Sequence, residues 1–241
     1  MQKRSAMTAW HMAVLIPARN EEKLLQRCLL SVQQARQFVQ GTVTTDVIVV
    51  ADCSTDRTEV IAEDCLRQSG LVVPSAVGRV GAARALAARL ALARYRGPLD
   101  RCWLANTDAD CVVPEDWLAL QLLAAQRDVP AMAGVVDVDS YEEHKAVVQT
   151  RFRLTYRINA DGTHPHVHGA NLGVRADSYL RAGGWAAQDT AEDHDLWRRL
   201  QGSAQLCVAD ATLKVITSGR RVGRAPHGFA GALAAHNEVE A

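Results

Sequence analysis

The chain has 241 residues, 27 basic and 27 acidic side chains, and a hydrophobic fraction of 48%. This composition predicts a folded core, and the zero net charge argues against a protein that holds nucleic acid through an excess of cations. No apolar stretch reaches the length of a membrane span, and the start of the sequence lacks the apolar region of a signal peptide. Six cysteines without a C-x-x-C pair predict reduced thiols and a cytoplasmic protein.

In its first half the chain alternates apolar strands with amphipathic helices, which is the pattern of a parallel α/β fold. Asn20 and Asp56 are suited to cap the first two helices, and Val60, Ile61 and Leu66 are expected on the buried face of the second. We expect strands at 13–16, 46–51, 71–73, 101–105 and 132–136, and helices at about 21–37, from 56, at about 82–95 and from Pro114.

The second half of the chain is less regular. We expect a helix over 141–158, a loop over 159–168, a strand at 170–174, helices near 176–181 and 192–200, and strands at 206–208 and 214–217. No repeat, low-complexity tract or linker interrupts the sequence, which predicts a single domain over residues 1–241. The expected fold class is α/β, with a mostly parallel central sheet flanked by helices.

Polar side chains follow three of the expected strands, at the end where open parallel sheets bind ligands. Pro17–Glu21 follows the first strand, Asp52 the second, and Asp108 and Asp110 the fourth. Asp52 comes directly after a buried strand, so its carboxylate is free to accept hydrogen bonds from a nucleobase or a ribose. These three segments predict a ligand site at one edge of the sheet.

The D-x-D spacing occurs three times, at Asp108/Asp110, Asp137/Asp139 and Asp193/Asp195, so the spacing alone carries little information. Only the first pair follows a buried strand at the ligand-binding edge. There two carboxylates can hold Mg²⁺ or Mn²⁺, hard cations that prefer oxygen ligands and bridge to phosphates. The second pair is expected simply to end a strand.

Six motifs together carry a resemblance to a known family. They are V-L-I-P-A-R-N-E-E (14–22), V-I-V-V-A-D-C-S-T-D-R-T (47–58), V-G-A-A-R-A-L-A (80–87), W-L-A-N-T-D-A-D (103–110), H-G-A-N-L-G-V-R (168–175) and A-E-D-H-D-L (191–196). In their order and approximate spacing, over roughly residues 12–200, the chain resembles the nucleotide-sugar-dependent glycosyltransferases of family 2, which have the GT-A fold. The resemblance implies a nucleotide-binding half over about 12–110 and an acceptor-binding half over about 111–241.

The resemblance also implies a role for individual residues. Asp193 would be the catalytic base, and Glu192 would help to position the acceptor. Asp110, together with Asp108, would ligate Mn²⁺ or Mg²⁺, and His227 is a candidate further ligand. The nucleotide would contact Pro17, Ala18, Arg19, Glu21, Asp52, Arg84 and Asp108; the sugar or acceptor would contact His168, Gly169, Ala170 and Asn171; and the diphosphate would contact Arg220 and Arg221.

This set of residues implies an inverting glycosyltransferase that moves a sugar from a nucleoside-diphosphate sugar to an acceptor hydroxyl. A metal ion offsets the charge of the departing diphosphate, and a carboxylate takes the proton of the attacking hydroxyl. One base without a nucleophile on the opposite face predicts a single displacement. Ala51 and Ala85 depart from the family's usual acidic and Asn residues, and the sequence identifies neither the sugar, the nucleoside, the acceptor nor the oligomeric state.

Other interpretations remain open at the level of sequence. Asp108 and Asp110 also imitate the nucleophile motif of haloacid-dehalogenase-type phosphohydrolases, although that motif belongs on a first strand. A non-catalytic GT-A domain that binds nucleotide is a further alternative, and Glu192 and Asp193 also suit the acidic first turn of an ordinary helix. His164, His166 and His168 alternate, so they would share one face of a strand and suit zinc, but Gly162 and Pro165 favour a loop.

Overall fold

The computed structural model describes residues 9–202, 206–225 and 228–238. In these ranges one seven-stranded sheet has the order β3-β2-β1-β4-β6-β5-β7. The strands are β1 (His11–Ala18), β2 (Thr44–Asp52), β3 (Leu71–Ser75), β4 (Cys102–Asn106), β5 (Ala131–Val138), β6 (Leu172–Arg175) and β7 (Val208–Thr217). No helix in the described ranges is long and apolar enough to cross a lipid bilayer.

The sheet is parallel except around β6, which runs antiparallel to both of its neighbours, β4 and β5. This confirms the expectation of a mostly parallel sheet. β1 pairs with β2 on one side and with β4 on the other. The carboxyl ends of these three central strands therefore meet at one edge, and the polar segments that follow them are brought together there.

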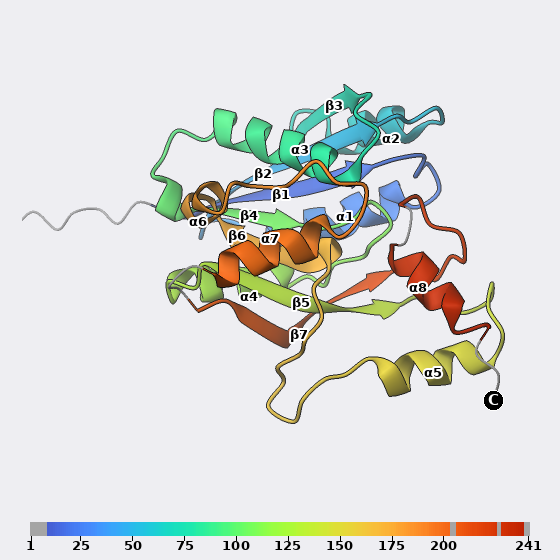
Figure 1. Ribbon diagram of the computed structural model, residues 1–241. Coiled ribbons are helices and arrows are strands. Elements are labelled where there is room, and N and C mark those ends of the chain that lie inside the picture. Colours follow the sequence, from blue (N-terminus) through green and yellow to red (C-terminus); the bar gives the residue numbers. More distant parts are fainter. Residues whose placement is uncertain (1–8, 203–205, 226–227, 239–241) are drawn as a thin grey trace, which may run out of the picture.

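Helices cover both faces of the sheet (Figure 1). Along β1, Met12, Val14 and Ile16 belong to the core under α1 (Leu25–Phe38) and α4 (Trp117–Gln126), whereas Ala13 and Leu15 belong to the core under α3 (Val80–Arg94). This alternation is the two-residue period of a strand buried on both faces. The helices flanking the sheet are α1 (Leu25–Phe38), α2 (Thr58–Leu66), α3 (Val80–Arg94), α4 (Trp117–Gln126), α6 (Ala176–Arg181) and α7 (Glu192–Gln201), and short 3₁₀ turns occur at Leu99–Arg101 and Gly169–Asn171.

A small separate core joins α5 (Val147–Thr155) to α8 (Phe229–Ala235), beside β5 and β7 (Figure 1). Val148 and Phe152 of α5 pack against Leu233 of α8. Phe229 meets the ring of Phe152 edge to face at 5.8 Å. The C-terminal segment is thereby held next to the carboxyl edge of the sheet.

Several expected element boundaries are wrong. α1 begins at Leu25, because Asn20 has a left-handed backbone with φ of 53° and its side chain bonds elsewhere. α4 begins at Trp117, three residues after Pro114, whose carbonyl accepts from the Trp117 amide. The helix expected over 141–158 is reduced to α5, and the two strands expected at 206–208 and 214–217 are one strand, β7.

The second helix also differs from the expected pattern. Asp56 does bond its first amide, since Oδ1 accepts from the Thr58 N–H at 2.9 Å. Leu66 is buried as expected, but Val60 is 47% exposed and Ala62 takes the buried position in its place. The helix is thus rotated relative to the stripe that the sequence pattern suggested.

Candidate active site

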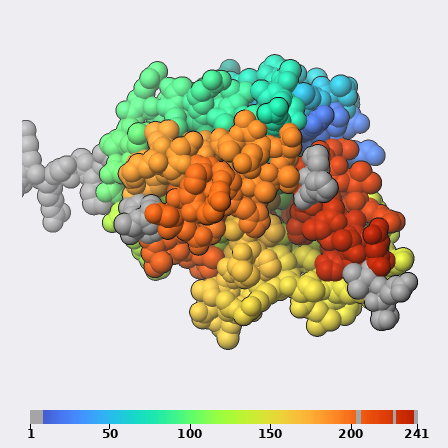
Figure 2. Space-filling model, viewed as in Figure 1, coloured from blue at the N-terminus to red at the C-terminus, as the bar shows by residue number. Residues whose placement is uncertain are grey.

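A cavity of about 560 Å³ opens at the carboxyl edge of the sheet. Its walls come from the segments that follow β1, β2 and β4, from the start of α3, and from the C-terminal segment after β7. Figure 2 shows this C-terminal segment, in red, lying close to the blue N-terminal elements. Of the residues predicted from the sequence, the cavity is lined by Pro17, Ala18, Arg19, Glu21, Asp52, Asp108, Asp110 and Arg220.

Asp52 ends β2 and is only 4% exposed. Its Oδ1 accepts hydrogen bonds from the backbone amides of Val77 at 3.0 Å and Gly78 at 3.2 Å. These bonds hold the loop after β3 against the end of β2. In the described part of the chain no hydrogen bond reaches Oδ2, which leaves that oxygen as an acceptor at the cavity wall.

The loop after β1 is tied to the loop after β2 by side-chain bonds. The side-chain oxygen Oδ1 of Asn20 accepts from the Thr55 backbone amide at 2.8 Å, and the Asn20 backbone amide donates to the Ser54 hydroxyl at 3.2 Å. The Glu21 amide donates to the Thr58 hydroxyl at 2.7 Å. Asn20 therefore joins two loops of the site instead of capping α1, and it fixes the position of Glu21.

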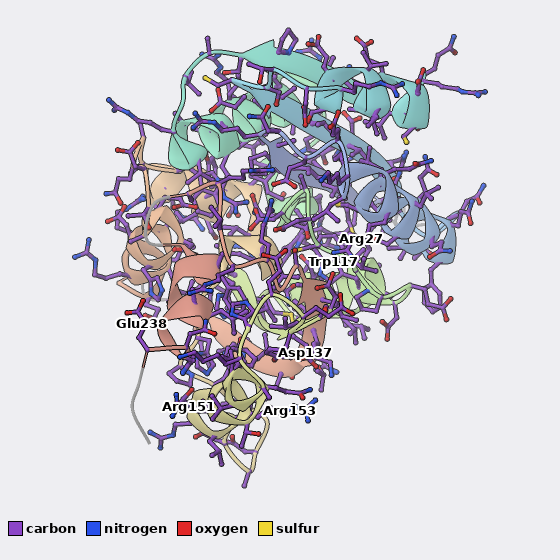
Figure 3. All side chains as sticks on the ribbon, turned by 90° about the vertical axis from the view of Figure 1, so that its right-hand side faces the viewer. Arg27, Trp117, Asp137, Arg151, Arg153 and Glu238 are labelled. Atoms are coloured by element: carbon purple, nitrogen blue, oxygen red, sulfur yellow. The ribbon has the colours of Figure 1, made fainter. Side chains whose placement is uncertain are left out.

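The turn after β4 presents Asp108 and Asp110 to the cavity. The Cys111 amide closes the turn on the Asp108 carbonyl at 3.0 Å. Arg27 of α1, labelled in Figure 3, supports the turn from the side of α1, because its guanidinium donates to the Asp110 carbonyl at 3.0 Å and pairs with Asp139 at 2.6 Å. Bonds to main-chain carbonyls thus hold the turn, and the two carboxylates remain available to pair with cations.

Arg84 links the cavity to the first turn of α7. Its side chain is 2% exposed; Nη2 lies 2.5 Å from Asp108 Oδ1, and Nε lies 3.2 Å from Glu192 Oε1. Burial raises the pKa of Glu192, and the neighbouring Arg84 opposes that effect. Gly169 packs on the guanidinium so closely that an added Cβ would lie 2.5 Å from Nη2. Arg84 therefore lies behind Asp108, as a buried cation, and does not line the cavity itself.

Arg220 joins the C-terminal segment to the N-terminal loop. Its Nη2 pairs with Glu21 at 2.7 Å and also contacts Asp110. Burial raises the pKa of Glu21, whereas the bond from Arg220 lowers it. Arg224, which no motif in the sequence marked, also lines the cavity and donates to the Asn20 carbonyl at 2.8 Å. The signal for Arg224 was its place in the Arg- and Gly-rich segment after the last strand.

Asp193 lies in the first turn of α7, next to the predicted sugar-binding segment. Its Oδ2 accepts from the Gly169 amide at 2.8 Å, and its Oδ1 accepts from the His194 amide at 2.8 Å. Asp193 also lies within electrostatic range of Arg84, which binds Asp108. The predicted base and the predicted donor-binding carboxylate are thereby connected through one buried arginine.

Three members of the predicted sugar-binding segment are engaged within the protein. Asn171 is fully buried; its amide donates to the carbonyls of Val135 and Leu213, and its oxygen accepts from Trp117. Ala170 is 7% exposed, and His168 Nε2 is bonded to the Tyr156 hydroxyl at 2.8 Å. Asn171 has no polar atom left for a sugar, so we assign it a structural role and correct that part of the prediction.

Of the remaining predicted residues that the structure describes, Glu192, Asp193 and Arg221 also lie outside the lining of the cavity. The backbone amide of Arg221 bonds the Glu143 carboxylate at 2.8 Å, which directs this residue toward the loop before α5. Of the two arginines predicted to contact a diphosphate, Arg220 lines the cavity and Arg221 does not. His227, the candidate metal ligand, lies outside the described residues.

The three alternating histidines lie in a loop, as the sequence favoured. Their rings stack nearly parallel, with centroids 5.9 Å apart for His164–His166 and 6.0 Å apart for His166–His168. Tyr156 stacks on His166 at 3.9 Å. Parallel rings do not converge on a metal, and within the described residues no group of three or more His, Cys, Asp or Glu is arranged to hold one.

The residues of the cavity nevertheless fit a divalent cation that arrives with a diphosphate. Asp110 and Glu21 both contact one guanidinium nitrogen, so their carboxylates converge on the same position. Mg²⁺ and Mn²⁺ are commonly held by one or two carboxylates together with substrate phosphates and water. The donor set of hard oxygen atoms is therefore suitable without a third protein ligand.

The comparison with known families excludes one of the interpretations left open by the sequence. A family model described as glycosyl transferase family 2 matches residues 13–181. The chain belongs to glycosyl transferase family 2. This excludes the phosphohydrolase alternative, and the match contains the segments that carry Asp52, Arg84, Asp108 and Asp110. No curated protein matches the sequence.

Solved structures share the fold of this family 2 chain. The mannosyltransferase PcManGT from Pyrobaculum calidifontis, in complex with GDP-Man and Mn²⁺, has a TM-score of 0.65 and 20% identity over 96% of this chain and 70% of its own. TarS 1–349 from S. aureus, in complex with UDP-GlcNAc, has a TM-score of 0.63 and 15% identity over 91% of this chain. The chain spans 61% of that TarS structure. These likenesses confirm the GT-A fold.

Proposed function

We propose that the protein is an inverting glycosyltransferase that takes a sugar from a nucleoside-diphosphate sugar and gives it to an acceptor hydroxyl. The observation that carries this proposal is the convergence of Asp52, Asp108, Asp110 and Arg220 on one cavity at the carboxyl edge of the sheet. The nucleoside would lie against Asp52 and the loop after β1, and the diphosphate between the Asp108–Asp110 turn and Arg220. The two solved structures named above hold such donors, which supports the assignment.

Asp110, whose carboxylate converges with that of Glu21, would hold Mn²⁺ or Mg²⁺ together with Asp108 on the same turn, and the bound cation would offset the negative charge that grows on the departing diphosphate. Asp193 would accept the proton of the acceptor hydroxyl as its oxygen bonds to the anomeric carbon. At the same time the bond from that carbon to the phosphate oxygen breaks, and its electron pair leaves with the nucleoside diphosphate. Attack on the face opposite the leaving group inverts the anomeric carbon.

We also propose that Arg84 and Glu192 position these groups without touching the donor. Arg84 holds Asp108 in place, and Glu192 pairs with the Nε side of the same guanidinium.

All six cysteines are unpaired, which supports a reducing cytoplasmic setting.

The donor assignment is tested by calorimetry with UDP, GDP and dTDP, in Mn²⁺ or in EDTA. We expect at least one nucleotide to bind in Mn²⁺, and we expect Asp110→Ala to weaken that binding by roughly tenfold or more, because a charged ligand is lost. Asp189→Asn, at the exposed rim of the same cavity, is the matched control and should change little. An affinity that is equal in EDTA and in Mn²⁺ would contradict the metal assignment.

The catalytic assignment is tested by donor turnover in Asp193→Asn. The variant should bind the nucleotide like the wild type but lose about 10²–10⁴-fold in rate, which is the usual contribution of a general base. A wild-type rate in this variant would refute Asp193 as the base. Nucleotide binding without any turnover in the wild type, across a panel of sugar donors and hydroxyl acceptors, would favour the non-catalytic alternative.

A further inference from the structure

Arg220 occupies the position at which the two acids of the cavity could share a cation. One of its nitrogens, Nη2, pairs with Glu21 at 2.7 Å and also contacts Asp110. The side chains of Glu21, Asp110 and Arg220 are 6%, 13% and 16% exposed, so the contact is shielded from water. A guanidinium placed between two shielded carboxylates offsets the charge that a divalent ion would otherwise offset.

A divalent ion and this guanidinium would repel each other if both were bound to Asp110. Both are cations, and at low exposure their repulsion is screened far less than at an open surface. An ion that approaches Asp110 alone must therefore displace Arg220 and leave the guanidinium without its second partner. An ion that arrives with a diphosphate brings new anionic oxygens that Arg220 can bind instead.

The backbone beneath Arg220 is held, so the exchange would be a movement of the side chain. The Gly219 amide donates to Asp139 at 2.9 Å, and the Gly219 carbonyl bonds the His144 ring at 2.9 Å. The Arg221 amide donates to Glu143 at 2.8 Å. These bonds fix both neighbours of Arg220, whereas its long side chain can turn from Asp110 toward the centre of the cavity.

We propose that Arg220 is an exchangeable internal cation that blocks the metal site until the nucleotide arrives. Arg220 neutralises Asp110 and Glu21 while the cavity is empty, and it transfers to the diphosphate when metal and nucleotide bind together. Free Mn²⁺ then binds weakly, and metal and nucleotide strengthen each other's binding. The proposal rests on the proposed function only for the identity of the anion that receives Arg220.

The experiment titrates Mn²⁺ into the full chain without nucleotide and follows the free ion by electron paramagnetic resonance. We expect Arg220→Gln to bind Mn²⁺ roughly tenfold more tightly than the wild type, because one close repulsion is removed. Arg221→Gln removes the adjacent arginine, which lies outside the cavity, and is the matched control that should bind like the wild type. Arg220→Lys keeps the charge and should also stay close to the wild type.

Two additions make the result specific. The gain should vanish when Arg220→Gln is combined with Asp110→Asn, because the proposed ligand is then gone. A nucleoside diphosphate should tighten Mn²⁺ binding in the wild type much more than in Arg220→Gln. Thermal melts give a second readout: Mn²⁺ alone should raise the Tm of Arg220→Gln more than that of the wild type.

Equal Mn²⁺ affinity in the wild type and Arg220→Gln, or a gain that survives Asp110→Asn, would overturn the proposal. If Arg220→Gln does not fold, wild-type protein that binds Mn²⁺ as tightly without nucleotide as with it would overturn it as well. If Arg220→Gln binds Mn²⁺ more tightly but the wild type binds no nucleotide, the proposed function alone would be refuted. Nucleotide-dependent Mn²⁺ binding without that gain would leave the function standing and remove this proposal.

Discussion

At the scale of single residues, the ligand that the cavity can bind depends on which carboxylate oxygens are not already hydrogen-bonded within the protein. Asp52 illustrates this, since Oδ1 already accepts two backbone amides and only Oδ2 is available to a ligand. A single free acceptor matches the one N3–H of uracil or thymine. Guanine presents two adjacent donors and is best matched by a carboxylate with both oxygens free. The sequence predicted Asp52 at the carboxyl edge of the sheet, where it lies, but the occupied oxygen is visible only in the structure.

We therefore predict that UDP and dTDP bind more tightly than GDP, by roughly tenfold or more, because an unmatched buried donor is costly. Calorimetry of the three nucleotides in Mn²⁺ measures this directly. Asp52→Asn should reduce the affinity for UDP more than that for GDP, because its amide presents a donor to N3–H. Preferential binding of GDP by the wild type would show that Asp52 does not read the base in this way.

At the scale of elements, the fit of the 169–171 turn against α3 and α7 decides whether the site is assembled. Gly169 is needed for close approach: an added Cβ would lie 2.5 Å from Nη2 of Arg84. Its amide also holds Asp193. The family motif predicts Gly169 as a sugar or acceptor contact, and the structure adds that Gly169 packs against the guanidinium of Arg84.

We predict that Gly169→Ala costs about 1–3 kcal/mol of unfolding free energy, the usual range for an overpacked site. It should also weaken nucleotide binding, because Arg84 must move away from Asp108. Denaturant unfolding and calorimetry measure the two effects. Gly231→Ala is the matched control, since nothing lies within 4 Å of its added Cβ and it belongs to α8. Wild-type stability and affinity in Gly169→Ala would mean that Arg84 adjusts without loss.

At the scale of the whole molecule, residues far apart in the sequence form one wall of the cavity. Arg220 and Arg224 reach back to Glu21 and Asn20. The small core between α5 and α8 holds this C-terminal segment in place. Arg151 of α5, labelled with Arg153 in Figure 3, donates to the His236 carbonyl at 2.9 Å and strengthens that attachment. The packing of the C-terminal segment against α5 therefore keeps one wall of the cavity in place.

The pH dependence of stability also belongs to this scale. Burial lowers the pKa of His168 to about 4; Asp193 opposes this effect, and His166, His194 and His164 add to it. The Tyr156 hydroxyl accepts from the Val136 amide, so it donates its proton to His168 Nε2 and favours the neutral ring. The unfolded chain takes up a proton near pH 6.5, whereas the folded chain does not. Stability from this group is thus present above pH 6.5 and lost as the pH falls toward 4.

We predict that the wild type loses about 2 kcal/mol more unfolding free energy between pH 7.5 and pH 5 than His168→Gln does. Urea unfolding at both pH values measures the difference. Glutamine keeps an oxygen that can accept from Tyr156, so this variant should still fold. If both proteins lose the same amount, His168 is not the group responsible for the acid sensitivity.

The sequence by itself determined the α/β class, the order of most elements and the position of the polar segments. It could do so because strand burial, D-x-D placement and helix periodicity are local patterns. The expected caps and boundaries at Asn20, Pro114 and 141–158 were wrong where contacts between loops outweighed local preference. The burial of Val60 was wrong for a related reason, because the packing of α2 is set by its neighbours.

Only the tertiary structure decided which polar groups face the cavity and which are used up inside the protein. Asn171 and Arg84 look alike in the sequence as conspicuous polar residues of family motifs, yet one joins strands and the other supports a carboxylate. Arg220 and Glu21 are 199 positions apart, so no local pattern could pair them. The physical reason is that a buried charge or amide must find a partner, and that partner is chosen by the fold.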